Sequence, residues 1–316
     1  MRIIVALLCW LAFAASAQNY PNRAVKVVVP WPPGQATDIA ARVVAERLQS
    51  ALNQPFVIEN KPGAGGAIGS DVVAKSAPDG YTLLAASSGP LSIMPNLQKT
   101  PYDSLKDFAP ISVIAAVPFA LVVSPSFPAA NAKEFIAEVK ANPGKYTFSS
   151  SGTGATAHLF TELFNSVAGL QARHVPYKGT APAITDIING QITYTVETVA
   201  ATAPHIKSGR LKTYGVSTLR RSGAMPDVPP LAEAAGLDYE AAAWIGYAAP
   251  QGTPREILNR LSAEIQKALQ SNELKERYVF LGLDPVATTP DEMASFMRRE
   301  QERYGAIIRA ANIKVE

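Results

Sequence analysis

Cysteine and histidine are scarce in this chain. Cysteine occurs once, as Cys9, and histidine three times, as His158, His174 and His205. A disulfide within the chain is excluded because it needs two cysteines, and a zinc site built from several thiolates is excluded as well. The histidines are not spaced as ligands of one metal ion, and a lone histidine in a globular domain is most often a hydrogen-bonded structural residue. We therefore predict no metal site and no cofactor.

The sequence also lacks an excess of charge of one sign. It has 29 Lys and Arg residues against 26 Asp and Glu residues, a net charge of +3. Binding to a phosphate backbone needs clustered basic residues, so we predict that the protein does not bind nucleic acid. The zinc-protease motif H-E-x-x-H, the hydrolase motif G-x-S-x-G and the phosphate loop G-x-x-x-x-G-K-[ST] are absent from the sequence.

Long apolar runs are confined to the first residues. Arg2 precedes an apolar stretch over residues 3–14, and Ala15-Ser16-Ala17 has the A-x-A pattern of a cleavage site. We predict a signal peptide over residues 1–17, cleaved after Ala17, and export to the periplasm. Cys9 lies inside the apolar stretch after a leucine, which favours an apolar signal residue over a lipid-attachment site. No later stretch reaches the roughly 18 apolar residues of a membrane span, so a soluble mature protein is expected.

What is present is an alternation of short apolar runs with helical patterns, typical of βαβ units. In a first series, strands are expected at residues 25–29, 56–60 and 81–86, and helices from Thr37 and over residues 67–77. A second series has expected helices at 129–142, 155–169, 182–189 and 203–208. Its expected strands are 145–150, 173–177, 192–197 and 211–217. Two such series predict two α/β lobes.

Two segments are expected to cross between the lobes. Residues 108–128 hold two apolar runs broken at Pro118, which predicts one strand that ends the first lobe and another that begins the second. The run over residues 241–250 would return the chain to the first lobe. Helices are expected after Thr253 and Thr289, which both open a capping box with proline at the first helical position. A cleft between the lobes, at the carboxyl ends of the strands, is where ligands bind in open α/β sheets.

The most informative motif is SSSGTGATAH, residues 149–158, between an expected strand and an expected helix. Free backbone N–H groups at a helix N-terminus attract an anion, and glycines let it approach the backbone. Together with the hydroxyls of Ser150, Ser151 and Thr153, the motif predicts an anion site of carboxylate size. The alternative is a tight strand-to-helix turn with a capping serine.

The same motif also matches the dinucleotide pattern G-x-G-x-x-A through Gly152, Gly154 and Ala157. A dinucleotide site needs an acidic residue about 20 positions further on to hold the ribose hydroxyls. Residues 171–179 contain none. Dinucleotide binding is therefore not favoured.

A counterpart in the first series is WPPGQATD, residues 31–38, which again joins a strand end to a helix start. Its backbone N–H groups suit a second anion contact; they belong to Gly34, Gln35, Ala36 and Thr37. Trp31 can cover the ligand or be buried in the core. Asp38 can bind a ligand hydroxyl or ammonium group, or simply complement the positive helix start.

Further candidates stand at other strand ends. Ser87 and Ser88 follow the strand at 81–86, and Tyr177, Lys178 and Gly179 end the strand at 173–177. Alternation along residues 192–197 puts Glu197 on the face of Thr193 and Thr195 at the end of its strand. The glycine-rich run PGAGGAIG, residues 62–69, misses the spacing of a phosphate loop, and a structural turn is favoured there.

In this order the residues resemble a known family. The run PWPPGQATDIAARVVAERLQSALNQPFVIENKPGAGGAIGSDVVAKSAPDGYTLLAAS is similar to the N-terminal half of the substrate-binding proteins of tripartite tricarboxylate transporters, the Bug family. The segments FSSSGTGATAHL, VPYKGTAPAITDIINGQI, RSGAMPDVPPLAEAAG and WIGYAAPQGTP follow in the same order as in that family. The resemblance covers essentially the whole mature chain.

The resemblance implies a two-lobed α/β fold of the type II-like periplasmic binding protein class. Each lobe would be an α/β sandwich around a central mixed sheet, with residues 18–118 and 239–316 in the first lobe and residues 119–238 in the second. It implies a non-enzymatic, monomeric receptor that closes on a small mono- or dicarboxylate, aliphatic or aromatic. The partners would be the membrane permease subunits of a tripartite tricarboxylate transporter.

The resemblance also implies which residues line the cleft. These are Trp31, Gly34, Gln35, Ala36, Thr37, Asp38, Ser87, Ser88, Ser151, Gly152, Thr153, Gly154, Tyr177, Lys178 and Gly179. His158 and Glu197 are added from their positions after a glycine-rich turn and at a strand end. The family usually has a second glycine at the position of Gln35 and an aspartate at that of Glu197. The competing interpretation is an exported hydrolytic enzyme that uses Ser151, His158 and Glu197.

Overall fold

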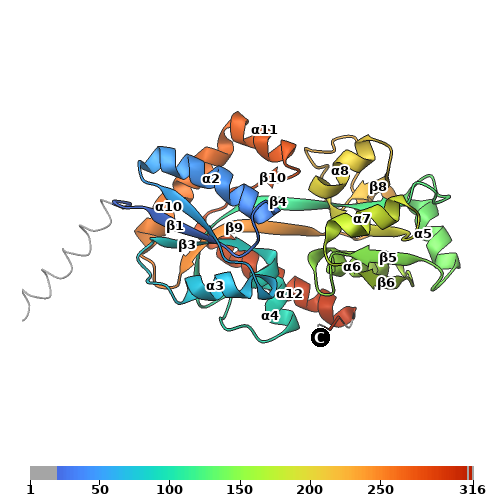
Figure 1. The fold of residues 1–316 in the computed structure, drawn as a ribbon, viewed down its shortest axis with the longest axis horizontal. Coiled ribbons are helices and arrows are strands. Elements are labelled where there is room, and N and C mark those ends of the chain that lie inside the picture. Colours follow the sequence, from blue (N-terminus) through green and yellow to red (C-terminus); the bar gives the residue numbers. More distant parts are fainter. Residues whose placement is uncertain (1–19, 312, 315–316) are drawn as a thin grey trace, which may run out of the picture.

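The computed structural model describes residues 20–311, 313 and 314. The predicted signal peptide lies outside the described residues. The described chain forms a 10-stranded mixed sheet with helices on both sides, extended into two lobes (Figure 1). The strand order is β2-β1-β3-β9-β4-β7-β5-β6, and β10 and β8 pair with β4 beside this path.

The first lobe, at the left of Figure 1, begins with three parallel strands. β1 (Val25–Val29) pairs with β2 (Phe56–Asn60) and β3 (Thr82–Ser87), and β3 pairs antiparallel with β9 (Ala242–Pro250). The apolar runs thus form strands as predicted. The helices of this lobe are α2 (Ala36–Leu52), α3 (Ala67–Ala74), α4 (Met94–Leu97), α10 (Arg255–Gln270) and α11 (Asn272–Phe280).

The second lobe, at the right of Figure 1, repeats the alternation of strands and helices. β5 (Thr147–Ser150) pairs in parallel with β6 (Arg173–Pro176) and β7 (Tyr194–Thr198), while β7 and β8 (Lys212–Val216) lie antiparallel to β4. The helices are α5 (Ala132–Ala141), α6 (Thr156–Ala168), α7 (Thr180–Ile188), α8 (Val199–Lys207) and α9 (Leu231–Ala235). The helices α7 and α8 begin two and four residues earlier than predicted.

The predicted break at Pro118 is wrong, because β4 (Phe108–Val123) is one strand of 16 residues. β4 pairs with β9 as far as Pro118, opposite Ala242, and with β7 and β8 from Phe119 and Ala120 onward. Proline cannot donate a ladder hydrogen bond. It stands where the strand exchanges its partners, so its missing N–H interrupts neither ladder, and the strand continues from one lobe into the other.

The starts of two helices also differ from the prediction. The N-cap of α2 is Gln35 and not Thr37, because the carboxylate of Asp38 reaches back and accepts the backbone N–H of Gly34 at 2.9 Å. The hydroxyl of Thr253 donates to the carbonyl of Pro250 at 2.8 Å, so it forms no capping box for α10. The second predicted capping box, between Thr289 and Glu292, is confirmed at the start of α12 (Pro290–Ala310).

The core is apolar and continuous through both lobes. The predicted apolar face of α10 is buried: Ile257, Leu258, Leu261, Ile265 and Leu269. The last helix, α12, contacts α4 of the first lobe and α6 of the second, where Tyr304 stacks on Phe160 with ring centroids 6.0 Å apart. The short β10 (Asp284–Pro285) joins α11 to α12 and pairs with β4. The lobes are therefore connected by β4, β9 and the packing of α12.

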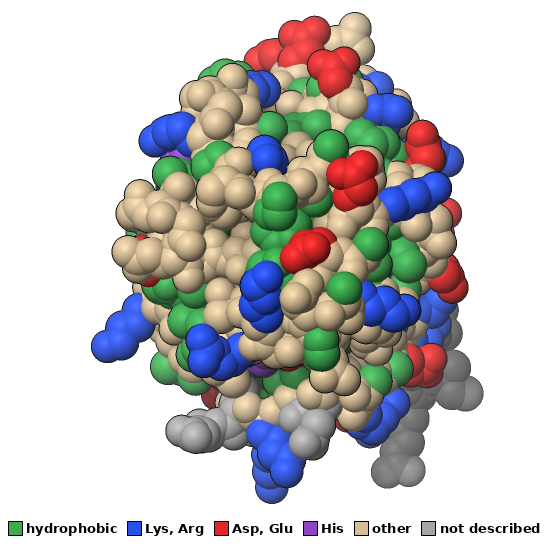
Figure 2. Space-filling view, turned by 90° about the vertical axis from the view of Figure 1, so that its right-hand side faces the viewer, with side chains coloured by type: hydrophobic (Ala, Val, Ile, Leu, Met, Phe, Trp, Pro, Cys, Tyr) green, Lys and Arg blue, Asp and Glu red, His purple; other side chains and the backbone are tan. Residues whose placement is uncertain are grey.

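The outer end of the second lobe carries charges of both signs. Figure 2 shows Lys and Arg side chains interspersed with Asp and Glu side chains on this face, without a continuous basic area. No helix within the described residues is both long and apolar enough to cross a membrane.

Candidate functional site

A cavity of about 920 Å³ lies between the two lobes and is lined by residues of both. Four helices have their first residues at this cavity: α2, α6, α7 and α8. The first N–H groups of a helix have no partner within the helix, and they form the positive end of its dipole. The sequence predicted the contributions of α2 and α6. The arrival of α7 and α8 at the same cavity was not predicted.

Most of the predicted site residues line this cavity. From the first lobe these are Trp31, Gly34, Gln35, Ala36, Thr37, Ser87 and Ser88. From the second lobe they are Ser151, Gly152, Thr153, Gly154, Gly179 and Glu197. Four predicted residues are not part of the lining: Asp38, His158, Tyr177 and Lys178. Their contacts explain why.

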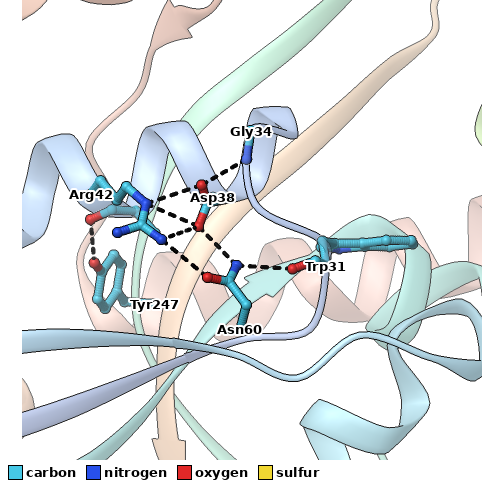
Figure 3. A network of polar contacts seen from close by, with 7 residues as sticks. Trp31, Gly34, Asp38, Arg42, Asn60 and Tyr247 are labelled. Atoms are coloured by element: carbon cyan, nitrogen blue, oxygen red, sulfur yellow. Dashed lines mark hydrogen bonds and ion pairs between the residues drawn. The ribbon is translucent and has the colours of Figure 1, made fainter.

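Asp38 is 2% exposed and lies in a polar network behind the cavity wall (Figure 3). Its carboxylate accepts hydrogen bonds from Gly34 N at 2.9 Å, Arg42 Nε at 3.0 Å and Asn60 Nδ2 at 2.8 Å. The Nδ2 atom of Asn60 also donates to the carbonyl of Trp31 at 2.9 Å. Burial acts to raise the pKa of Asp38, but the hydrogen bonds from Arg42, Gly34 and Asn60 hold this pKa below its usual value. Asp38 therefore shapes the turn that presents Gly34 and Gln35, and does not itself face the cavity.

His158 is buried beneath the loop between β5 and α6. Its Nδ1 accepts the backbone N–H of Gly154 at 3.1 Å, and its ring stacks on that of His174 with centroids 3.9 Å apart. The Nε2 atom of His174 lies 2.7 Å from the hydroxyl of Ser150. Burial and the neighbouring His158 lower the pKa of His174 to about 4. The two rings support the glycine-rich loop from behind.

The contacts of His158 do not support the hydrolytic interpretation. The Nδ1 atom of His158 binds a backbone N–H and its Nε2 lies 3.8 Å from Glu162, whereas a general base would bind the hydroxyl of Ser151. The carboxyl of Glu197 contacts Thr180 and Thr198. The three residues of the proposed hydrolytic set are thus not connected to one another.

Tyr177 and Lys178 lie next to the cavity but outside its lining. The hydroxyl of Tyr177 donates to Asp186 Oδ2 at 2.6 Å, which directs the ring along α7, and Lys178 is exposed. Only the last residue of this predicted group, Gly179, lines the cavity, where it is the N-cap of α7.

Trp31 is half-buried and lines the cavity, so it is not a core tryptophan. Its indole Nε1 donates to the hydroxyl of Ser87 at 2.9 Å, which joins the ends of β1 and β3. The second tryptophan of the lining, Trp244 on β9, is 2% exposed and was not predicted. An apolar strand residue gives no signal in the sequence that it borders a cavity.

Glu197, the residue before the last one of β7, lines the cavity and is 4% exposed. Its Oε1 accepts the backbone N–H of Thr198 at 2.8 Å, and its Oε2 accepts the hydroxyl of Thr180 at 3.2 Å. Burial raises the pKa of Glu197, and the hydrogen bonds from Thr198 and Thr180 only reduce this effect.

The remaining lining was not predicted. Ala64 and Gly65, in the turn at 62–69 that the sequence analysis interpreted as structural, also line the cavity. The apolar walls include Met94, Phe119, Leu281 and Leu283. Among the described lining residues there is no Lys, Arg or His. Within the same described range, no group of three or more His, Cys, Asp and Glu residues is arranged to hold a metal ion.

A family model described as the tripartite tricarboxylate transporter family receptor matches residues 40–313. The chain belongs to this family. Protein BugT of Bordetella pertussis is 39% identical over 311 residues, which cover 97% of this chain and 94% of BugT. The predicted family membership is therefore confirmed, and a family of periplasmic solute receptors agrees with the prediction of a protein that is not an enzyme.

Two solved structures share the fold. Rpa4515 of R. palustris, determined with adipate, is 33% identical with a TM-score of 0.82, and the match covers 93% of this chain and 99% of that one. MatC of Rhodopseudomonas palustris, determined with bound malate, is 31% identical with a TM-score of 0.76, and the match covers 92% and 100%. The predicted two-lobed α/β fold is confirmed by these similarities.

Proposed function

We propose that this protein captures a small carboxylate in the cavity between its lobes and delivers it to the membrane permease of a tripartite tricarboxylate transporter. The observation that carries the proposal is the convergence of four helix N-termini on one cavity whose described lining has no cationic side chain. Backbone N–H groups and helix dipoles favour an anion without any titrating cation. The adipate and malate in the two related structures support the same ligand class.

The cavity combines these N-termini with apolar walls. Trp31, Phe119 and Trp244 contribute aromatic surface to its lining. This arrangement suits an aliphatic or aromatic chain with carboxylate groups at its ends, because the chain is buried against the walls while the charged groups meet N–H and O–H donors. We propose that the ligand contacts those predicted residues that line the cavity. Asp38, His158, Tyr177 and Lys178 are left out because they are not part of the lining.

Capture requires the lobes to close on the ligand. We propose that residues 18–118 and 239–316 form the first lobe and that residues 119–238 form the second. The backbone angles that change on closure would be those near Pro118 and over residues 241–244, since Pro118 pairs with Ala242 where β4 changes partners. The working location is the periplasm, after removal of residues 1–17, and the receptor acts as a monomer.

Differential scanning fluorimetry with succinate, malate, adipate and benzoate tests the ligand class, and calorimetry on the compounds that raise the melting temperature gives their affinity. A bound compound that is recovered unchanged supports a receptor; conversion of the compound would support the hydrolytic alternative. Failure of all carboxylates to bind would overturn the proposal.

A paired substitution tests the second lobe's contribution. Ser151→Ala with Thr153→Ala removes two hydroxyls at the cavity, and we expect a loss of about 1–3 kcal/mol of binding free energy, because they would donate to a charged group. The matched control is Ser166→Ala with Thr185→Ala, which removes two exposed hydroxyls outside the cavity. Unchanged affinity of the first variant would place the carboxylate elsewhere.

A further inference from the structure

Glu197 is the only ionisable side chain among the described residues that line the cavity. Its carboxyl is buried at the junction of two helix N-termini, between the hydroxyl of Thr180 on α7 and the backbone N–H of Thr198 at the N-cap of α8. Both partners are uncharged donors, and with the dipoles of α7 and α8 they favour the carboxylate of the empty receptor. An anionic ligand in the same cavity would add a second negative charge, and two like charges close together disfavour the charged form of at least one of them.

Among the described residues, the hydrogen bonds to the Glu197 carboxyl come from Thr180 and Thr198, and none comes from a cationic side chain. Lys178, two residues before Thr180, is exposed. On α6, the imidazole of His158 is paired with the carboxylate of Glu162 at 3.8 Å and not with Glu197. From α7, Asp186 accepts a hydrogen bond from Tyr177, and from β8, Lys212 donates to the carbonyl of Phe127. The basic residues of α8, His205 and Lys207, are in its last turn, at the opposite end from Thr198. Among the described residues, β4 and β5 have no charged side chain.

We propose that Glu197 meets the ligand as a neutral carboxylic acid and donates its proton in a hydrogen bond to a ligand oxygen, so that binding of the anion is linked to the uptake of one proton. This inference rests on the proposed function, since it needs a carboxylate in this cavity. It adds to the proposed function that Glu197 is protonated when the ligand is bound, and that Glu197 is the donor in its hydrogen bond with the ligand.

The proton balance is simple. In the empty receptor at alkaline pH, the Glu197 carboxylate accepts from Thr180 and Thr198. When the anion enters, one proton from solvent adds to the carboxylate, and the resulting O–H donates to the ligand oxygen. The hydroxyl of Thr180 can remain in contact because it both donates and accepts. On release of the ligand the proton returns to solvent, and no other bond forms or breaks.

The opposite role would be a charged Glu197 that binds a ligand ammonium group. Comparing malate with aspartate distinguishes the two roles. The two compounds share a carbon skeleton, but malate has a hydroxyl group where aspartate has an ammonium group. The proposed role favours malate, because a neutral acid cannot pair with a cation. A charged Glu197 would favour aspartate.

The experiment is isothermal titration calorimetry between pH 5.5 and 8.5, with adipate as the probe and malate in its place if adipate does not bind. Two buffers of different ionisation enthalpy at each pH give the number of protons taken up. We expect uptake to rise toward one proton per ligand as the pH rises. Affinity should fall by up to about tenfold per pH unit once the pH exceeds the pKa of Glu197 in the empty receptor.

Glu197→Gln isolates the residue, because glutamine keeps the shape and a donor but does not titrate. The affinity of the variant for adipate should lose the fall with rising pH that wild type shows, and the proton uptake should be removed. Glu233→Gln is the matched control: this exposed glutamate of the same lobe lies outside the cavity, and the variant should keep the proton uptake of wild type.

Three results would overturn the inference while leaving the proposed function intact: a carboxylate that binds at pH 8.5 without proton uptake, the same uptake in Glu197→Gln, or tighter binding of aspartate than malate that the glutamine variant loses. If no carboxylate binds to wild type at pH 5.5, the proposed function fails, and this inference fails with it.

Discussion

The indole Nε1 of Trp31 donates a hydrogen bond of 2.9 Å to the hydroxyl of Ser87, and both residues line the cavity. The two residues are 56 positions apart in the sequence and stand at the ends of adjacent parallel strands. The bond fixes the orientation of the indole ring on the cavity wall. Because the wall is already ordered in the empty protein, ligand binding loses less conformational entropy.

Loss of this bond should weaken binding. Ser87→Ala leaves the indole N–H without this partner, and we expect about 0.5–1.5 kcal/mol weaker binding of adipate, measured by calorimetry. Trp31→Phe removes the same bond from the other side. In a double-mutant cycle the Ser87→Ala change should cost less in the Trp31→Phe background than in wild type. Simple additivity of the two changes would show that the bond does not couple them.

The carboxylate of Asp38 should stabilise the fold in a pH-dependent way. Because its pKa is lowered in the folded protein, its contribution is present above the ordinary value of 3.8 and is lost as the pH falls below it. Asp38→Asn should therefore lower the free energy of unfolding by about 1–3 kcal/mol at pH 7, and by less at pH 3. Urea unfolding at the two pH values measures this.

Asp291→Asn provides the comparison for this substitution. Asp291 is an exposed partner of Arg255 in the first turn of α12, so its loss should change stability far less than the loss of Asp38. Equal effects of the two substitutions at pH 7 would contradict the role given to the network around Asp38.

His174 should make the protein less stable in acid. Its pKa is lowered to about 4 from the ordinary 6.5, so the unfolded chain binds a proton at this residue between these values while the folded protein does not. Stability is therefore complete above pH 6.5 and falls as the pH is lowered toward 4. In His174→Gln the decrease in melting temperature over this range should be smaller by a few degrees. An identical decrease in both proteins would show that another group is responsible.

The close approach of Gly282 to Ala200 links the turn after α11 to the start of α8. A Cβ at residue 282 would lie 2.7 Å from the Cα of Ala200, and the φ of Gly282 is +72°. Gly282→Ala should separate the two lobes at this edge of the cavity and weaken adipate binding by about tenfold, equivalent to about 1.4 kcal/mol. Calorimetry measures the effect.

Gly236→Ala separates this contact from backbone strain. Gly236 has a φ of +70°, and a Cβ there would have no atom within 4 Å. Both variants bear the cost of a left-handed alanine, on the order of 1 kcal/mol in stability. Only the Gly282 variant should lose affinity. Equal affinities of the two variants would show that the contact with Ala200 does not affect the closed arrangement.

The sequence predicted the strands of both lobes and the two helix starts, those of α2 and α6, that the structure places at the cavity. Apolar runs identify strands directly, and the glycines and hydroxyls of Ser151–Gly154 lie immediately before α6, so local spacing contains the information. By contrast, the sequence predicted a break at Pro118, and β4 is continuous there. Local reasoning treats a proline as an end of a strand, whereas the exchange of partners at Pro118 depends on where β7, β8 and β9 lie.

The sequence by itself determined the family, the alternation of elements and the part of the cavity lining that comes from strand ends and helix starts, because these follow from short motifs and periodicity. Only the tertiary structure decided that α7 and α8 join α2 and α6 there, that Asp38 and His158 stand behind the wall, and that the hydrogen bonds to the Glu197 carboxyl come from Thr180 and Thr198. The reason is physical: burial, convergence of dipoles and hydrogen bonding between elements depend on distances between segments far apart in the chain.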